Sequence, residues 1–162
     1  EEEVKERAEQ VIKKLPKKLD LDKAMKNHKV EYEQCLNSVL HQEIMRYNNL
    51  LSKILSYLKN LIDAVNGDVI MTSDLESFLL KMYDNKTPRQ IEKISYPSLK
   101  PFSLWVNDFV EKLNFLQKWI DNGMPSSFWI DGFFLINSFL TGVLQNYARK
   151  VSKYLYLSNM YL

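Results

Sequence analysis

The amino-acid sequence predicts an all-α fold, a multi-helix bundle built around one long central helix over about residues 31–66. Apolar residues between Leu36 and Val65 recur at steps of three and four, which is the spacing of one helical face. A similar stripe runs from Phe102 to Ile120. No segment has a strong strand pattern, and strands do not alternate with helices. At most a short extended piece near residues 128–130 is therefore expected.

Two short helices are expected before the long one. The first covers residues 2–15 and ends before Pro16, since proline disfavours a helical conformation in the preceding residue. Asp20 is expected to cap the second, because its carboxylate can accept amide hydrogens of the first turn. The long helix begins as early as Glu31 and ends near Gly67, which can adopt a left-handed cap.

Glu43 and Arg46 fall largely off the apolar stripe of this helix. Their spacing allows an ion pair on the helix surface, which is worth roughly a few tenths of a kcal/mol. We interpret the pair as a surface feature.

Two shorter helices are predicted next. Ser73 and Glu76 match a capping box, which starts a helix ending at residue 82 or 83. Thr87 and Pro88 suit the cap and first position of another helix, which the proline-containing run 96–101 must end.

Two longer helices complete the sequence. The first runs from residue 102 or 103 to residue 121, and the second from about residue 135 to residue 150. The residues after 150 can continue the last helix, because their apolar positions keep the three-four spacing.

Composition restricts the class of protein. The 162 residues suffice for one domain, or one and a half, and a hydrophobic fraction of 46% is ordinary for a globular protein. A net charge of +2 with acids and bases interleaved argues against nucleic-acid binding. No apolar run reaches the ~18 residues of a membrane helix. The single cysteine excludes an internal disulfide and fits a reducing compartment. Without a starting Met, the sequence is expected to be a piece of a longer chain.

The sequence offers no catalytic, cofactor-binding or metal site. None of the four glycines precedes a Lys-Ser or Lys-Thr pair, so no phosphate-binding loop is predicted. His28 and His41 have no metal-ligand spacing. His41 with Glu43 makes a poor metal fragment, because residues two apart on a helix point in different directions.

Three features have both a functional and a structural interpretation, and we expect the structural one in each case. Cys35 is either a nucleophile or, without a paired histidine, an inert half-buried thiol. The pairs Lys13-Lys14 and Lys17-Lys18 either contact an acidic partner or are simply solvated. The apolar contexts of the tryptophans favour core positions over a ligand cage. These tryptophans are Trp105, Trp119 and Trp129.

Several strings resemble those of dynein heavy chains, and the wording is closer to the axonemal than to the cytoplasmic type. Residues 36–50, LNSVLHQEIMRYNNL, resemble the family's MNTVLxQExxRFNxL. Shorter matches are KLPKKLDL at residues 14–21, SYPSLKP at 95–101 and WIDNGMPS at 119–126, followed by FWIDGFF at 128–134 and SFLTGVLQNYARK at 138–150. Cys35, Leu36 and Tyr47 depart from the family's Ser, Met and Phe by changes that preserve size.

The resemblance implies a place within such a motor. Residues 1–66 would form the C-terminal part of the helical lid of the sixth AAA+ module. Residues 67–150 would begin the C-terminal domain, and residues 151–162 form a divergent tail that lacks the family's YTIPID continuation. The family's ATPase residues lie upstream of both parts, so none is carried over to this sequence.

The function implied by the resemblance is that of a non-catalytic structural segment, which couples the ring's last module to the C-terminal cap. The parent protein would be an ATP-driven, minus-end-directed microtubule motor with ATP and Mg as its cofactors. Its partners would be the AAA+ ring modules of the same heavy chain, microtubules and other dynein subunits, without nucleic acid or membrane. The expected location is the cytoskeleton, in a ciliary or flagellar axoneme. The alternatives are a free-standing helical protein-protein interaction module and an enzyme with an unrecognised site.

Excision from such a parent is expected to expose apolar surface and to promote self-association. The expected contributors are Phe128, Trp129, Phe133, Phe134, Tyr154, Leu155, Tyr156 and Leu157. The alternative is that these side chains fold back and complete the local core.

Overall fold

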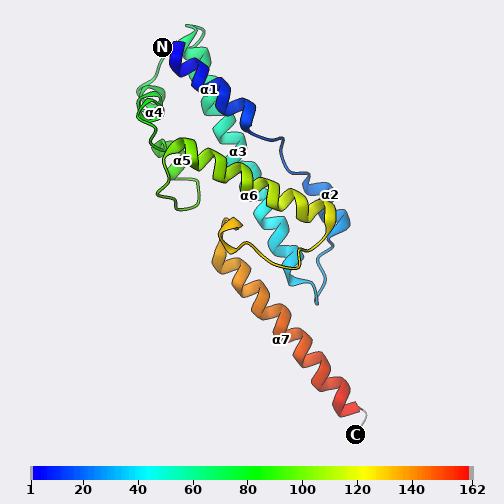
Figure 1. Cartoon of the computed structure of the whole chain (residues 1–162). Helices are drawn as coiled ribbons and strands as arrows, with labels where there is room; N and C mark the ends of the chain where they lie inside the picture. The colour runs from blue at the N-terminus through cyan, green and yellow to red at the C-terminus, as the bar shows by residue number, and fades with distance from the viewer. Residues whose placement is uncertain (1, 161–162) are drawn as a thin grey trace. The chain divides into compact units, whose positions relative to one another are not determined.

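A computed structural model describes residues 2–160 of the protein, with side chains up to residue 156. In order, its elements are α1 (Glu2–Lys14), α2 (Leu21–Asn27), α3 (Cys35–Val65), α4 (Ser73–Tyr83), α5 (Arg89–Glu92), α6 (Phe102–Asn122), the 3-10 turn η1 (Ile130–Gly132) and α7 (Ile136–Met160) (Figure 1). The described residues contain no strand, and the all-α prediction is confirmed. Within the same residues, no helix is both long enough and apolar enough to cross a membrane.

The protein forms two compact units. Unit 1 consists of Glu1–Lys18 and Tyr47–Asn114, and unit 2 consists of Leu19–Arg46 and Phe115–Leu162. The helices α3 and α6 each contribute residues to both units. Both units draw residues from either side of residue 66, and the proposed lid boundary there stays a prediction.

The long helix α3 is a single unbroken helix of 31 residues, and its predicted stripe is buried from Leu36 to Leu61. It begins at Cys35 and not at Glu31, because residues 31–34 form a separate turn in which Gln34 N donates to Glu31 O at 3.0 Å. At its other end Gly67 has φ +84°, the left-handed conformation predicted for it.

The predicted caps of three helices have different outcomes. Asp20 caps α2 as expected, since its side chain accepts from Lys23 N at 2.8 Å. For α4 the cap is one residue earlier than predicted: Thr72 Oγ1 accepts from Leu75 N at 3.3 Å, and Ser73 is the first helical residue.

The predicted Thr87 cap of α5 is wrong. Pro88 occupies the cap position of this short helix. The Thr87 hydroxyl instead donates to Lys100 O at 3.4 Å.

Unit 1 has an aromatic core, which is bordered by a cluster of charged side chains around Asp108. Rings from α3, α6 and the segment between α5 and α6 pack together: Tyr47, Tyr96, Phe102, Trp105 and Phe109. The Tyr96 hydroxyl donates to Asp108 Oδ2 at 3.2 Å, and Lys100 Nζ lies 2.6 Å from Asp108 Oδ1.

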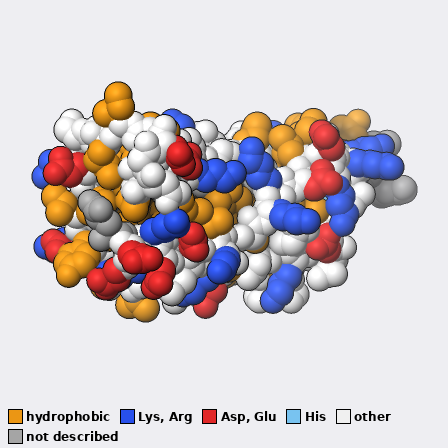
Figure 2. All heavy atoms as spheres, turned by 90° about the horizontal axis from the view of Figure 1, so that it is seen from above, with side chains coloured by type: hydrophobic (Ala, Val, Ile, Leu, Met, Phe, Trp, Pro, Cys, Tyr) orange, Lys and Arg blue, Asp and Glu red, His pale blue; other side chains and the backbone are white. Residues whose placement is uncertain are grey.

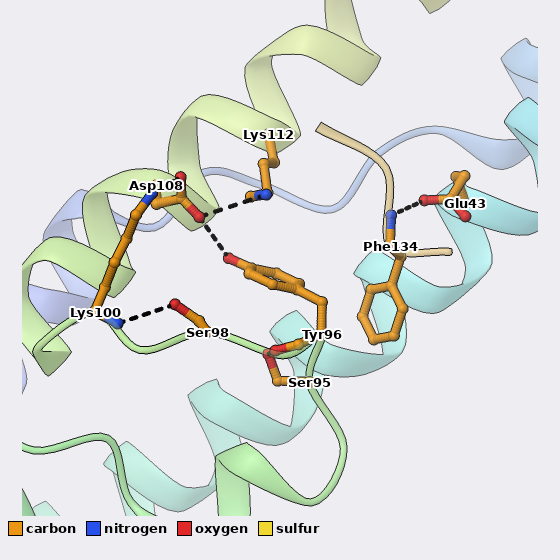
Figure 3. Close-up of polar contacts among 8 residues, drawn as sticks. All are labelled: Glu43, Ser95, Tyr96, Ser98, Lys100, Asp108, Lys112 and Phe134. Atoms are coloured by element: carbon orange, nitrogen blue, oxygen red, sulfur yellow. Dashed lines mark hydrogen bonds and ion pairs between the residues drawn. The ribbon is translucent and has the colours of Figure 1, made fainter. Parts of the chain in front are cut away.

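The Nζ of Lys112, itself buried, lies 3.6 Å from Asp108 Oδ2 and 4.4 Å from the centre of the Tyr96 ring (Figure 3). These polar contacts attach the irregular segment 95–101 to α6.

Candidate interaction surface

A buried carboxylate sets the start of α7. Glu43, on the part of α3 that belongs to unit 2, has a side chain with 0% exposure. It accepts a hydrogen bond from Phe134 N (Figure 3) and another from Leu135 N at 3.2 Å. The first amide groups of a helix have no partner within that helix. Glu43 therefore holds the backbone just before α7 from a different helix.

The interpretation of Glu43 as a surface residue is wrong. The predicted ion pair with Arg46 does form, with Arg46 Nη1 3.3 Å from Glu43 Oε1, but the carboxylate is buried. Glu43 lies three residues after Leu40 and four before Tyr47, both fully buried, so its position belongs to the stripe. This spacing is the sequence signal that identifies Glu43 as a buried residue. A charged residue on a buried stripe needs partners.

Burial raises the pKa of the Glu43 carboxyl above its ordinary 4.5, against the opposing effects of the two backbone amides and Arg46. The folded protein then holds the proton more tightly than the unfolded protein. This contribution to stability is fully present below about pH 4.5 and is lost as pH rises through the folded pKa.

We expect the difference in free energy of unfolding between the wild type and Glu43→Gln to change over that pH window and to be flat above it. Urea unfolding at a series of pH values measures this difference. A difference in free energy of unfolding that does not vary with pH would contradict the raised pKa of Glu43.

An aromatic cluster packs the segment before α7 against α6 within unit 2. Its rings are Phe115, Trp119, Phe128, Trp129, Phe133 and Phe139. Phe133 stacks on Phe139 with ring centres 4.1 Å apart. Gly132 is needed here, because a Cβ would lie 2.9 Å from Trp129 Cε3. Trp105 and Trp119 are core residues as expected, whereas Trp129 is 36% exposed at the edge of the cluster.

One side of α7 is occupied by contacts with α3 and the turn before it. At Gly142 the helices approach so closely that a Cβ would lie 2.8 Å from Val39 Cγ2. Further along, Arg149 Nη1 donates to Tyr32 O at 2.7 Å and the guanidinium lies over the Tyr32 ring. Lys153 Nζ forms an ion pair with Glu33 at 2.7 Å.

The opposite side of α7 is apolar and exposed. We call it the α7 face: Ile136, Leu140, Val143, Leu144, Tyr147, Val151, Tyr154 and Leu155. These residues keep the three-four spacing that places them on one side of a helix. Leu144 and Tyr147 are 69% and 70% exposed.

A groove of about 450 Å³ borders the α7 face. Its lining is apolar except for Asn146 and Lys150, and is completed by side chains of α3 and of the segment before α7: Leu36, Met124, Phe128 and Ile130.

The predicted exposed surface is partly confirmed. Tyr154, Leu155 and Tyr156 are exposed, and the tail continues the helix as expected. Phe133, by contrast, is only 2% exposed, because it stacks in the aromatic cluster. Phe128 and Phe134 are half-buried, and the side chain of Leu157 lies outside the described residues.

The other candidates for a chemical role are Cys35, His28 and His41, and each lies in a structural environment. Cys35 is buried, with Arg149 Nη1 2.9 Å from its Sγ. His28 Nε2 lies 3.2 Å from Ile120 O, and His41 is buried. Among the described residues, no group of three or more histidine, cysteine or acidic side chains is placed to hold a metal ion.

The lysine pairs at residues 13–14 and 17–18 are exposed. On the face shown in Figure 2, acidic and basic side chains are interspersed.

Similarity to known proteins extends over nearly the whole sequence. The family model for the C-terminal domain of the dynein heavy chain matches residues 1–160. The protein is 45% identical over 150 residues to dynein axonemal heavy chain 1 of Rattus norvegicus and 46% identical over 150 residues to dynein axonemal heavy chain 3 of Homo sapiens. It is 44% identical over 142 residues to dynein axonemal heavy chain 12 of Mus musculus.

These matches cover 93%, 93% and 88% of this sequence, but only 3%, 4% and 5% of the three relatives. The 162 residues therefore span a small part of the length of the proteins they resemble.

Proposed function

The protein belongs to the family defined by the C-terminal domain of dynein heavy chains, and we propose that it is a non-catalytic structural segment of an axonemal dynein heavy chain. In this proposal the parent is an ATP-driven microtubule motor that binds ATP and Mg outside this segment. The segment itself couples the last ring module to the C-terminal cap.

The α7 face carries this proposal. A contiguous exposed apolar stripe on an ordered helix is typical of a surface that packs against another protein part. Within unit 2, Glu43 binds the backbone just before α7, and Gly142 and Arg149 on the other side of α7 contact α3 and the turn before it, so the face is presented by a helix that is held in place. Packed helices of this kind can pass a rigid-body movement from one module to the next.

The buried charged groups support a structural role. Glu43 binds backbone amides, and Asp108 binds the hydroxyl of Tyr96 and the ammonium groups of Lys100 and Lys112. Each of these groups is used to attach one segment of its unit to another. In the proposal, the direct partners of the segment are modules of the same heavy chain. The parent protein is what binds microtubules and other dynein subunits, and it locates the segment to the axoneme.

We expect the isolated protein not to bind ATP. The sequence has no glycine-rich loop followed by a Lys-Ser or Lys-Thr pair, and among the described residues no group of three or more histidine, cysteine or acidic side chains could hold a metal ion. Isothermal titration calorimetry with Mg-ATP should give only heats of dilution. Saturable binding at micromolar concentration would contradict the proposal. Sequencing the coding region on both sides would separate it from a free-standing interaction module, which needs no P-loops upstream.

The isolated protein is also expected to self-associate weakly through the α7 face. Sedimentation velocity over a tenfold range of concentration should show a rising average mass. Leu144→Glu should give a monomer, because it places a charge in the middle of the apolar face. The matched control is Tyr156→Glu, since Tyr156 is 69% exposed on α7 but lies outside the face. A wild-type protein that stays monomeric throughout, without binding a dye for apolar surface, would refute this expectation.

A further inference from the structure

We propose that the α7 face binds an amphipathic helix whose apolar stripe is flanked by acidic side chains, with one of them opposite Lys150. This inference names the chemistry of the neighbour that covers the α7 face in the proposed function. It rests on the proposed function only because it requires that such a neighbour exists.

The shape of the face fits a helix. The face runs from Ile136 to Leu155, which at 1.5 Å per residue is a length of about 28 Å. Leu140, Tyr147 and Tyr154 recur every seven residues, the repeat by which two helices pack along a common seam. The groove beside Leu140 and Tyr147 provides the depth that a row of side chains from a second helix needs.

The charge of α7 selects the partner. From Ile136 to Met160 the helix has three cationic residues and no acidic residue. Two of the cations, Arg149 and Lys153, are bound to Tyr32 and Glu33 on the side away from the face. Lys150 lines the groove at the edge of the apolar stripe, next to Tyr147. A helix lying in the groove therefore brings its flanking residues close to Lys150, where acids are favoured and bases are disfavoured.

A second copy of the protein fits this face less well. Its α7 has the same three cations and no acid, and a parallel pair places Lys150 against Lys150. An antiparallel pair avoids that contact but still supplies no anion. We therefore expect an acidic helix to compete successfully with self-association.

Two synthetic peptides of about 21 residues, long enough to cover the face at 1.5 Å per residue, test the inference. Both have the same leucine stripe at three-four spacing; one has glutamate at all flanking positions and the other has lysine. Fluorescein-labelled peptides are titrated with the protein, at concentrations where it is monomeric, and anisotropy is recorded. The glutamate peptide should bind at least about fivefold more tightly at low salt, and the preference should shrink as salt is added.

Variants of exposed residues assign this preference to the face. Lys150→Glu should abolish or invert the preference, and Leu144→Glu should weaken binding of both peptides. Tyr156→Glu, outside the face, should change neither affinity. Circular dichroism confirms that each variant keeps its helix content.

Each other outcome overturns the inference. Equal affinity for both peptides, or a preference that survives Lys150→Glu, rejects the acidic partner and leaves the proposed structural role intact, since apolar packing alone suffices for that role. Binding of neither peptide while the protein dimerises through Leu144 assigns the face to a second copy. Binding of neither peptide by a protein that stays monomeric rejects both the inference and the use of this face in the proposed function.

Discussion

Leu58→Asp is expected to lower the free energy of unfolding by about 3–5 kcal/mol, which is among the largest effects of any single substitution. Leu58 is 0% exposed on α3 within unit 1, so the new carboxylate would be buried without a partner, and the apolar burial of the leucine would be lost. For a protein of this size, each kcal/mol corresponds to roughly 2–4 °C in melting temperature. We therefore expect a fall in Tm on the order of 10 °C in a calorimetric scan.

The matched control is Ser56→Asp, which adds the same charge to an exposed position of the same helix. It should change stability by less than about 0.5 kcal/mol. A Leu58→Asp variant that melts within a degree or two of the wild type would show that the stripe is not a core.

Glu43→Ala is expected to lower the free energy of unfolding by about 2–5 kcal/mol. The substitution removes the carboxylate that accepts from the part-buried Phe134 N and Leu135 N, and loss of the acceptor of a buried donor costs about 1–3 kcal/mol. Because these amides directly precede α7, hydrogen exchange should speed up in residues 134–140 before it does elsewhere in unit 2. Urea unfolding and exchange measured by mass spectrometry give the two readouts.

Two further variants test whether the loss of stability in Glu43→Ala comes from the missing hydrogen-bond acceptor. Glu43→Gln keeps one acceptor oxygen and should cost less than Glu43→Ala. Gln42→Ala changes an exposed neighbour on α3 and should be nearly neutral. If Glu43→Ala were as stable as Gln42→Ala, the carboxylate could not be what holds the start of α7.

The sequence by itself determined the helices and the family. The three-four spacing of Leu36 to Val65 is a local property of the sequence, and it correctly predicted which side of α3 is buried. Gly67 and Asp20 were correctly assigned for the same reason, since each cap depends on residues a few positions away. Strings such as SYPSLKP and WIDNGMPS identified the dynein heavy chain family, and the match over residues 1–160 confirms it.

Helix boundaries were less well determined. The turn at residues 31–34 and the Thr87 hydroxyl both form hydrogen bonds that compete with helix extension or capping. Thr72 and Ser73 are both suitable caps, and the backbone conformation selects the first of them. Such alternatives differ by a single hydrogen bond, so the surrounding fold and not the local sequence decides between them.

Only the tertiary structure decided the role of the charged residues. Glu43 is paired with Arg46 as the local spacing predicts, yet its main partners are 91 and 92 residues away, and no local pattern encodes such a contact. Phe133 and Tyr154 are both large aromatic residues near apolar neighbours, but one stacks in a cluster and the other is exposed. Burial depends on which segments pack together in the fold. This packing buries Phe133 and Glu43 and leaves the α7 face exposed.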